Sequence, residues 1–267
     1  MNAKNSPEKK AGVQTTSWGG VADWYDELLE ESADSFQAKV ILPNLTRAIN
    51  IKPGMKVLDV ACGQGFFSRV FAQAGAKVTA CDISPELVEI AKSKSTATIQ
   101  YHVAPADALR FAPDGSFEVI TIVLALQNIE NIAGVFAECS RVLAPGGRAY
   151  FVLNHPAFRI PRRSSWEWDE KAHAQYRRVD AYLSDDRISI DMSPGERNPR
   201  KKAMTVSFHR PLQVYFKALN KSGLVVGRLE EWISHKRSQK GPRQAEEDRT
   251  RKEIPMFMML EIVRPSI

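Results

Sequence analysis

The stretch from Val57 to Ala72, VLDVACGQGFFSRVFA, constrains the fold more than any other part of the chain. It begins with a short apolar run containing an acid, passes through a Gly-x-Gly turn at Gly63 and Gly65, and ends with apolar residues at helical spacing. This pattern predicts a strand, a tight turn and a helix. Glycines let the backbone approach a ligand closely, and the first N–H groups of the helix point toward it. We therefore expect a ligand above this turn.

Strand and helix patterns alternate from residue 56 onward, which predicts a doubly wound α/β fold with a parallel sheet. The expected strands are 56–60, 77–81, 99–103, 117–124 and 148–153, and the expected helices are 64–73, 86–93 and 132–143. A strand at 205–208, a helix at 212–221 and two strands at 224–232 and 254–263 follow. The overall pattern predicts a Rossmann-like, seven-stranded, mostly parallel sheet with a late antiparallel strand.

The flanking segments divide the chain further. Residues 1–16 are polar and predict a disordered tail, and residues 17–267 predict one domain. Residues 17–52 predict a lid of two helices, the second spanning 36–49 with a kink at Pro43, ahead of a cofactor-binding half at 53–155. Residues 156–204 predict an irregular inserted cap, and the C-terminal part, 205–267, includes an expected mobile basic loop at 235–252.

Charge and cysteine content restrict the possible partners. The chain has 267 residues, 37 basic and 31 acidic, with a net charge of +6, and much of the excess lies in 197–202 and 235–252. This local excess favours solvated loops over a nucleic-acid surface. The three cysteines show no metal-ligand spacing, and no apolar run is long enough to span a bilayer. With a polar N-terminus, these features predict a cytoplasmic protein without a metal site.

Three acids follow the predicted strands at the edge where such sheets bind ligands, namely Asp59, Asp82 and Asp107. Asp82 lies about twenty residues beyond the glycine turn, where a carboxylate can accept hydrogen bonds from a ribose. A nicotinamide cofactor is the competing ligand. Ser68 replaces the third glycine of its fingerprint, however, and Asp59 would repel a pyrophosphate while suiting a positively charged sulfonium.

These residues resemble motif I (Val57 to Gly65) and motif II (Val78 to Ser84) of class I S-adenosylmethionine-dependent methyltransferases. The segments 106–108, 117–128 and 141–147 resemble the later motifs in order and spacing. The resemblance covers residues 18–155 and points to the group that includes ubiquinone and menaquinone biosynthesis methyltransferases. Glu118 and Val123 depart from the family pattern, and the cap shows little likeness.

The resemblance implies S-adenosylmethionine as the cofactor and assigns residues to it. Gly63, Gln64 and Gly65 would meet its methionine part, and Asp82 would hold its ribose. Ile83 would pack on the adenine, with Asp107 and Ala108 at the edge of the ring. The complete implied set is Tyr25 on the lid, Asp59, Ala61, Gly63, Gln64, Gly65, Asp82, Ile83, Asp107, Ala108 and Leu124.

Candidates for the acceptor side lie after the fifth strand. His155 and His209 are candidate bases, with capping or packing roles as the alternative. Trp166 and Trp168 either line an acceptor pocket, which would make the acceptor apolar or aromatic, or pack the cap onto the domain. Arg210, with Arg69 and Arg159, either meets an acceptor carboxylate or is solvated.

The sequence therefore predicts methyl transfer to oxygen, nitrogen or carbon of a small organic acceptor. The segment 124–128 lacks the Asn/Asp-Pro-Pro-Tyr motif of amino-methyltransferases, which argues against a flipped base as acceptor. Two alternatives remain open. One is a catalytically inactive protein that binds the cofactor as a regulatory or partner subunit, and the other is an RNA-directed methyltransferase guided by 235–252.

Overall fold

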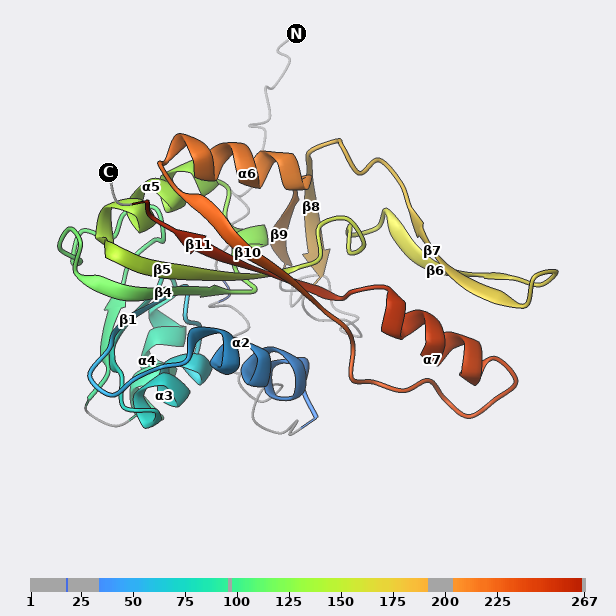
Figure 1. Ribbon diagram of the computed structural model, residues 1–267, viewed down its shortest axis with the longest axis horizontal. Coiled ribbons are helices and arrows are strands. Elements are labelled where there is room, and N and C mark those ends of the chain that lie inside the picture. Colours follow the sequence, from blue (N-terminus) through green and yellow to red (C-terminus); the bar gives the residue numbers. More distant parts are fainter. Residues whose placement is uncertain (1–17, 19–33, 96–97, 192–203, 266–267) are drawn as a thin grey trace, which may run out of the picture.

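The computed structural model describes residues 18, 34–95, 98–191 and 204–265. Its centre is a seven-stranded sheet in the order β10-β11-β5-β4-β1-β2-β3 (Figure 1). The strands are β1 (Lys56–Val60), β2 (Lys77–Asp82), β3 (Gln100–Val103), β4 (Phe117–Val123), β5 (Leu143–Asn154), β10 (Val225–Trp232) and β11 (Phe257–Val263). Strands β1 to β5 are parallel, and β11 runs antiparallel to both β5 and β10. The predicted fold class is confirmed.

Helices cover both faces of this sheet (Figure 1). One face carries α5 (Ile132–Val142) and α6 (Leu212–Lys221), and the other carries α2 (Leu42–Ile49), α3 (Phe66–Gln73) and α4 (Pro85–Ser93). Side chains along each strand alternate between the two cores. In β5, Phe151 packs with the α5 side and Val152 with the α2 side, as the two-residue repeat of a strand requires.

Local sequence signals explain where several helices begin and end. Ser84 Oγ accepts a hydrogen bond from the Leu87 N–H at 3.2 Å, so Ser84 caps α4, and Pro85 starts it. The helix predicted at 36–49 contains a π-helical turn, η2 (Gln37–Ile41), directly before α2. Close to the kink expected at Pro43, the chain thus forms a π-helical turn, which ends at Ile41 directly before α2.

The polar regions are more regular than the sequence indicates. The cap expected to be irregular contains β6 (Ser164–Asp169), β7 (Ala174–Val179) and β8 (Asp186–Asp191), and β8 pairs with β9 (Met204–His209). The loop expected at 235–252 contains α7 (Gln244–Glu253), which lies along β7 (Figure 1). This helix lacks an apolar face. Arg249 instead forms ion pairs with Glu246 and Glu253 one turn away on either side.

Some predictions fall on other parts of the chain. The tail at 1–16 and the first lid helix, with Tyr25, lie outside the described residues. The division into lid, cofactor half and cap stays a prediction. None of the helices in the described ranges is long and apolar enough to cross a bilayer.

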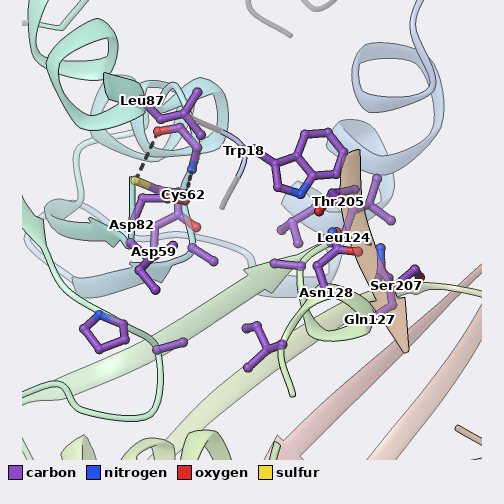
Figure 2. A pocket seen from close by; sticks show the side chains of 18 of the residues that line it. Trp18, Asp59, Cys62, Asp82, Leu87, Leu124, Gln127, Asn128, Thr205 and Ser207 are labelled. Carbon is purple, nitrogen blue, oxygen red and sulfur yellow. Dashed lines mark hydrogen bonds between the residues drawn. The ribbon is translucent and has the colours of Figure 1, made fainter. Parts of the chain in front are cut away.

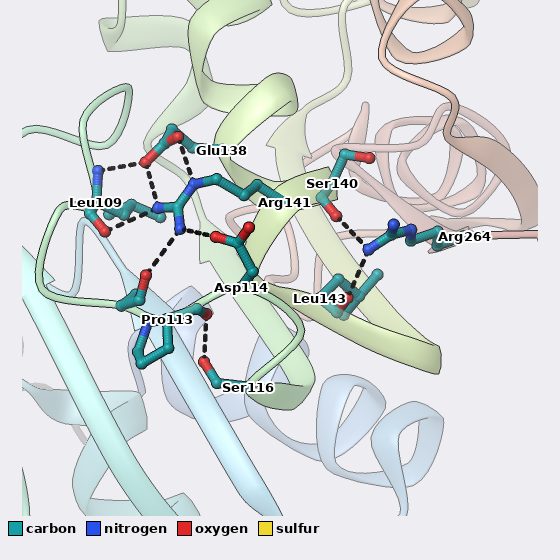
Figure 3. A network of polar contacts seen from close by, with 10 residues as sticks. Leu109, Pro113, Asp114, Ser116, Glu138, Ser140, Arg141, Leu143 and Arg264 are labelled. Carbon is teal, nitrogen blue, oxygen red and sulfur yellow. Dashed lines mark hydrogen bonds and ion pairs between the residues drawn. The ribbon is translucent and has the colours of Figure 1, made fainter.

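A polar network on α5 fixes the loop between β3 and β4 (Figure 3). Arg141 donates to the carbonyl oxygens of Leu109 and Ala112 at 3.0 and 2.9 Å and forms ion pairs with Glu138 and Asp114. Glu138 in turn accepts from the Leu109 N–H at 2.7 Å, and Arg141 lowers the pKa of the Glu138 carboxyl. One guanidinium therefore satisfies two loop carbonyls and two carboxylates.

We expect Arg141→Met to lower the free energy of unfolding by about 2 kcal/mol, because the two carbonyls and Glu138 lose a charged donor. Urea denaturation measures the change. Arg264→Met is the matched control, since Arg264 also donates to two carbonyls near α5, those of Ser140 and Leu143, but from an exposed position. It should cost less than about 1 kcal/mol. Equal losses in the two variants would contradict the assignment.

Candidate functional site

A cavity of about 730 Å³ opens at the carboxyl ends of β1, β2 and β4 (Figure 2). Its two ends differ in chemistry. The turn end lies at the glycine turn and is lined by Asp59, Cys62, Gly63, Asp82 and Leu87, and the β9 end is lined by Gln127, Asn128, Thr205 and Ser207. Figure 2 draws the indole of Trp18 between these groups. The volume suits a ligand larger than a single small metabolite.

Asp59 is buried beneath the turn end. Its Oδ2 accepts from Ser68 Oγ at 2.5 Å and its Oδ1 from Thr121 Oγ1 at 2.8 Å. Burial raises the pKa of Asp59 to about 6, although both hydroxyl contacts act to lower it. Ser68 therefore orients this carboxylate from the first turn of α3. It is also the residue that replaces the third glycine of the dinucleotide-binding fingerprint.

Asp82 joins the glycine turn to the start of α4. Its Oδ2 accepts from the Gly63 N–H and its Oδ1 from the Ser84 N–H, both at 2.9 Å. Burial raises its pKa, while these N–H donors act to lower it. The carboxylate lines the cavity at the end of β2, as predicted, and it also holds the turn in place.

Gly65 has a structural role and is not among the cavity-lining residues. It adopts φ +80° as the residue before α3, and a Cβ here would lie 2.5 Å from Tyr101 Oη and 3.1 Å from Ala91 Cβ. Gln64 next to it does line the cavity. Arg69 donates to the Gln64 side-chain oxygen at 2.8 Å, which leaves the buried Gln64 Nε2 as a donor with no partner among the described residues.

The rim of the turn end combines an apolar and a polar group. The Ile83 side chain is 50% exposed at the cavity wall, which is unusual for an isoleucine beside a buried strand end. Asp107 accepts from Asn131 Nδ2 at 2.8 Å, and Asn131 also caps α5 by accepting from the Gly134 N–H. The helix start thus positions Asp107, while Ala108 is not among the lining residues.

Two non-glycine residues adopt left-handed backbone conformations at neighbouring strand ends. Ala61 follows β1 with φ +55°, and Leu124 follows β4 with φ +54°. Both line the cavity. Gln127 supports the second turn, because its Nε2 donates to the Leu124 carbonyl at 2.7 Å. Such conformations cost about 1–3 kcal/mol each and concentrate at functional sites.

The strand β9 supplies a wall that the sequence does not indicate. Thr205 and Ser207 are buried and line the cavity, whereas Val206 and Phe208 alternate with them along the strand. Thr205 lies opposite Ile190 of β8, which also lines the cavity. The alternation of hydroxyl and apolar residues predicts a strand, but which sheet edge it joins depends on long-range pairing.

His155 does not reach the cavity. Asn154 at the end of β5 lines it, and the next residue points to the other side of the strand. His155 Nε2 contacts Glu231 Oε1 at 2.7 Å, and Nδ1 accepts from the Ala157 N–H at 3.2 Å. Burial lowers its pKa. Both ring nitrogens of His155 are engaged in contacts with the protein. This geometry matches the capping role that was the alternative to a catalytic base.

The other acceptor-side candidates also lie away from the cavity lining. His209 Nε2 donates to the Tyr182 carbonyl at 2.8 Å. Arg210 donates to the carbonyls of Ile129 and Glu130 at 2.9 and 2.7 Å, so it holds the loop after η3 (Leu126–Asn128). Its charge is met by protein oxygens, which corrects the expectation of an acceptor carboxylate here.

Trp166 and Trp168 belong to the hairpin β6–β7, which extends away from the sheet (Figure 1). Their rings stack under the guanidinium groups of Arg177 and Arg243, at 5.2 and 4.5 Å. Neither tryptophan lines the cavity. The two tryptophans therefore give no support to the expected apolar or aromatic acceptor, which stays a prediction, and other apolar side chains, among them Phe66, Phe67 and Ile190, line the cavity instead.

Many of the residues implied by resemblance do meet at one place. Those that line the cavity are Asp59, Ala61, Gly63, Gln64, Asp82, Ile83, Asp107 and Leu124. Trp18, Gln37, Asn154, Thr205 and Ser207 also line it but were not singled out from the sequence. They come from elements separated by long stretches of chain, so no local motif joins them.

Comparison with known proteins finds matches to the part of the chain that contains the glycine turn. Residues 58–151 match the family model described as a methyltransferase domain. A ubiquinone biosynthesis O-methyltransferase of Xanthomonas oryzae is 36% identical over 100 residues, covering 36% of this chain and 42% of the relative. A demethylmenaquinone methyltransferase of Tropheryma whipplei is 40% identical over 113 residues, covering 41% and 46%. The chain thus matches less than half the length of these curated relatives.

Solved structures resemble more of the fold. An S-adenosylmethionine-dependent methyltransferase from Mesorhizobium loti aligns with a TM-score of 0.65 and 24% identity, covering 82% of this chain and 95% of that one. At this identity the likeness speaks for the fold alone. The likeness covers a larger share of the chain than residues 58–151 do.

Proposed function

We propose that the chain transfers a methyl group from S-adenosylmethionine to a small organic acceptor. The proposal starts from two findings: residues 58–151 match the methyltransferase-domain family, and the fold resembles that of an S-adenosylmethionine-dependent methyltransferase. The observation that carries the proposal is the cavity itself. Its turn end gathers eight residues of the implied cofactor set, and its β9 end leaves space beside them.

The turn end suits the cofactor in charge and shape. Asp82 offers carboxylate oxygens to ribose hydroxyls, and the exposed Ile83 side chain offers an apolar surface to the adenine. The unpartnered Gln64 Nε2 is a buried donor suited to the cofactor carboxylate. Asp59, ionised above its pKa of about 6, favours the positive charge that the methionine part carries.

The acceptor side supports transfer without a dedicated histidine base. The described lining of the cavity contains no histidine, lysine or arginine. Displacement at a sulfonium methyl gains about 7–11 kcal/mol from alignment and exclusion of water alone. We therefore propose that the cavity orients the acceptor atom, whose lone pair forms the new bond to the methyl carbon as the C–S bond breaks. S-adenosylhomocysteine is the leaving group, and an acceptor O–H or N–H loses its proton to solvent.

Calorimetry with S-adenosylmethionine tests the proposal directly. Binding with one site per chain is expected, followed by formation of S-adenosylhomocysteine when an acceptor panel of small phenols, amines and quinols is added. A protein that binds the cofactor but turns over no acceptor would favour the regulatory alternative. A protein that does not bind the cofactor would contradict the proposal.

The pKa of Asp59 gives an expected pH dependence. Because that pKa is raised to about 6, the free protein holds a neutral Asp59 below this pH, whereas the cationic cofactor favours the ionised form. Affinity is therefore full above pH 6 and should fall up to about tenfold per unit as the pH decreases further. Calorimetry from pH 8 to pH 5 measures the slope. Asp59→Asn should flatten it, and constant affinity in the wild type would contradict the role.

A further inference from the structure

Two buried polar atoms at the β9 end of the cavity have no hydrogen-bond partner in the described chain. They are Thr205 Oγ1 and Gln127 Oε1. Thr205 is only 3% exposed, and both residues line the cavity (Figure 2). A buried polar group without a partner is costly, so such pairs in a cavity wall indicate groups that a ligand satisfies.

The Gln127 amide has a fixed orientation. Its nitrogen donates to the Leu124 carbonyl at 2.7 Å, and a carbonyl can only accept. The amide oxygen must therefore be the free end. An amide oxygen has no proton to give, so a ligand that satisfies it has to donate from a hydroxyl or an N–H group.

Thr205 adds a second uncharged group on the same wall. Its hydroxyl can donate or accept, and Ser207 lies on the same face of β9 two residues on. No cation lies in the described lining to balance an anionic ligand. An apolar ligand would leave both Thr205 and Gln127 unpaired. Sites reject molecules that lack a polar group in this way, because the buried polar groups of the protein then stay without hydrogen bonds.

We propose that Thr205 and Gln127 form an acceptor subsite for an uncharged molecule bearing a hydroxyl or N–H group. That group donates to Gln127 Oε1 and pairs with Thr205 Oγ1 when bound. The subsite defines the substrate class of the proposed methyl transfer and rests on that function. It assigns a specificity role to β9, which lies outside the segment that matches the family.

The test uses the full chain saturated with S-adenosylhomocysteine, so that no methyl group is transferred. The probes are phenol and aniline, with toluene and benzoate as the apolar and anionic counterparts, and saturation-transfer NMR measures their dissociation constants. Phenol and aniline should bind at least about fivefold more tightly than toluene and benzoate. Thr205→Val should reduce this preference, because only Gln127 Oε1 is then left to pair with the probe, and Thr205→Ser should keep it in full.

Ser189→Ala is the matched control. Ser189 Oγ on β8 is also buried without a partner, but Ser189 is not among the lining residues. This variant should leave the preference unchanged. In the absence of ligand, Thr205→Val should raise the melting temperature by about 2–4 °C, because a buried unpaired hydroxyl is removed. A merely structural hydroxyl would give a fall instead.

The outcomes separate the subsite from the proposed function. Equal binding of the four probes, tighter binding of toluene or benzoate, no binding of any probe, or a preference that is undiminished in Thr205→Val would each overturn the subsite. In all these cases S-adenosylhomocysteine still binds. Failure of S-adenosylhomocysteine itself to bind would overturn the proposed function instead.

Discussion

Replacing Asp82 with alanine is expected to weaken the binding of S-adenosylmethionine by at least about a hundredfold. Two hydrogen bonds from ribose hydroxyls to a carboxylate contribute about 1.5–3 kcal/mol each, and about 2.7 kcal/mol already corresponds to a factor of a hundred. The Gly63 N–H also loses its acceptor, so the glycine turn becomes less ordered. Calorimetry of the variant and the wild type at pH 7.5 measures the ratio.

Two further variants separate this effect from loss of charge. Glu89→Ala removes the same negative charge from the exposed face of α4, where Glu89 pairs only with Lys92, and should leave the affinity unchanged. Asp82→Asn keeps one acceptor oxygen and should fall between the wild type and Asp82→Ala. An affinity of Asp82→Ala within threefold of the wild type would show that the ribose binds elsewhere.

The second large effect is expected at Gly65. Gly65→Ala should lower the free energy of unfolding by about 3–4 kcal/mol, because two costs add. An alanine at φ +80° costs about 1–2 kcal/mol in backbone strain, and its Cβ would overlap Tyr101 Oη and press on Ala91. Urea denaturation at equilibrium measures the sum.

A double-mutant cycle with Tyr101→Phe divides that sum. Removing the Tyr101 hydroxyl relieves the 2.5 Å contact but leaves the backbone strain and the Ala91 contact. On its own, Tyr101→Phe should cost about 1 kcal/mol, since the hydroxyl is hydrogen-bonded to Ser95 Oγ at 2.8 Å. In the Tyr101→Phe background, Gly65→Ala should therefore cost less. An unchanged cost would mean that strain alone accounts for the effect.

The sheet and the turn end of the cavity were predictable because their signals are local. Strand periodicity, the caps of α4 and the acids at strand ends each lie within a few residues of what they determine. Asp82 is the last residue of β2, and Gly63 follows β1 by three residues. The resemblance to class I methyltransferases added the cofactor, and the family match over residues 58–151 confirmed that recognition.

The β9 end could not be predicted because it depends on contacts between distant segments. Thr205 becomes part of a wall only when β8 pairs with β9 and places it beside Gln127, 78 residues earlier in the chain by their numbers. From the sequence alone, Arg210 is expected to be a solvated cation at the surface. In the structure, its guanidinium donates to carbonyl oxygens of the loop after η3. His155 does not line the cavity because successive side chains at the end of β5 point to opposite sides, and Asn154 takes the side that faces the cavity.

Part of the β9 end comes from a later stretch of chain than the turn end, and this has a consequence for how such a protein can evolve. The turn end lies within the matched segment 58–151, as do Gln127 and Asn128, while Asn154, Pro161, Ile190, Thr205 and Ser207 come after it. Selection on β8 and β9 can therefore alter the β9 end of the cavity while Asp82, for which we propose ribose binding, is inherited unchanged. A mutant library confined to those two strands offers the shortest laboratory route to new substrates.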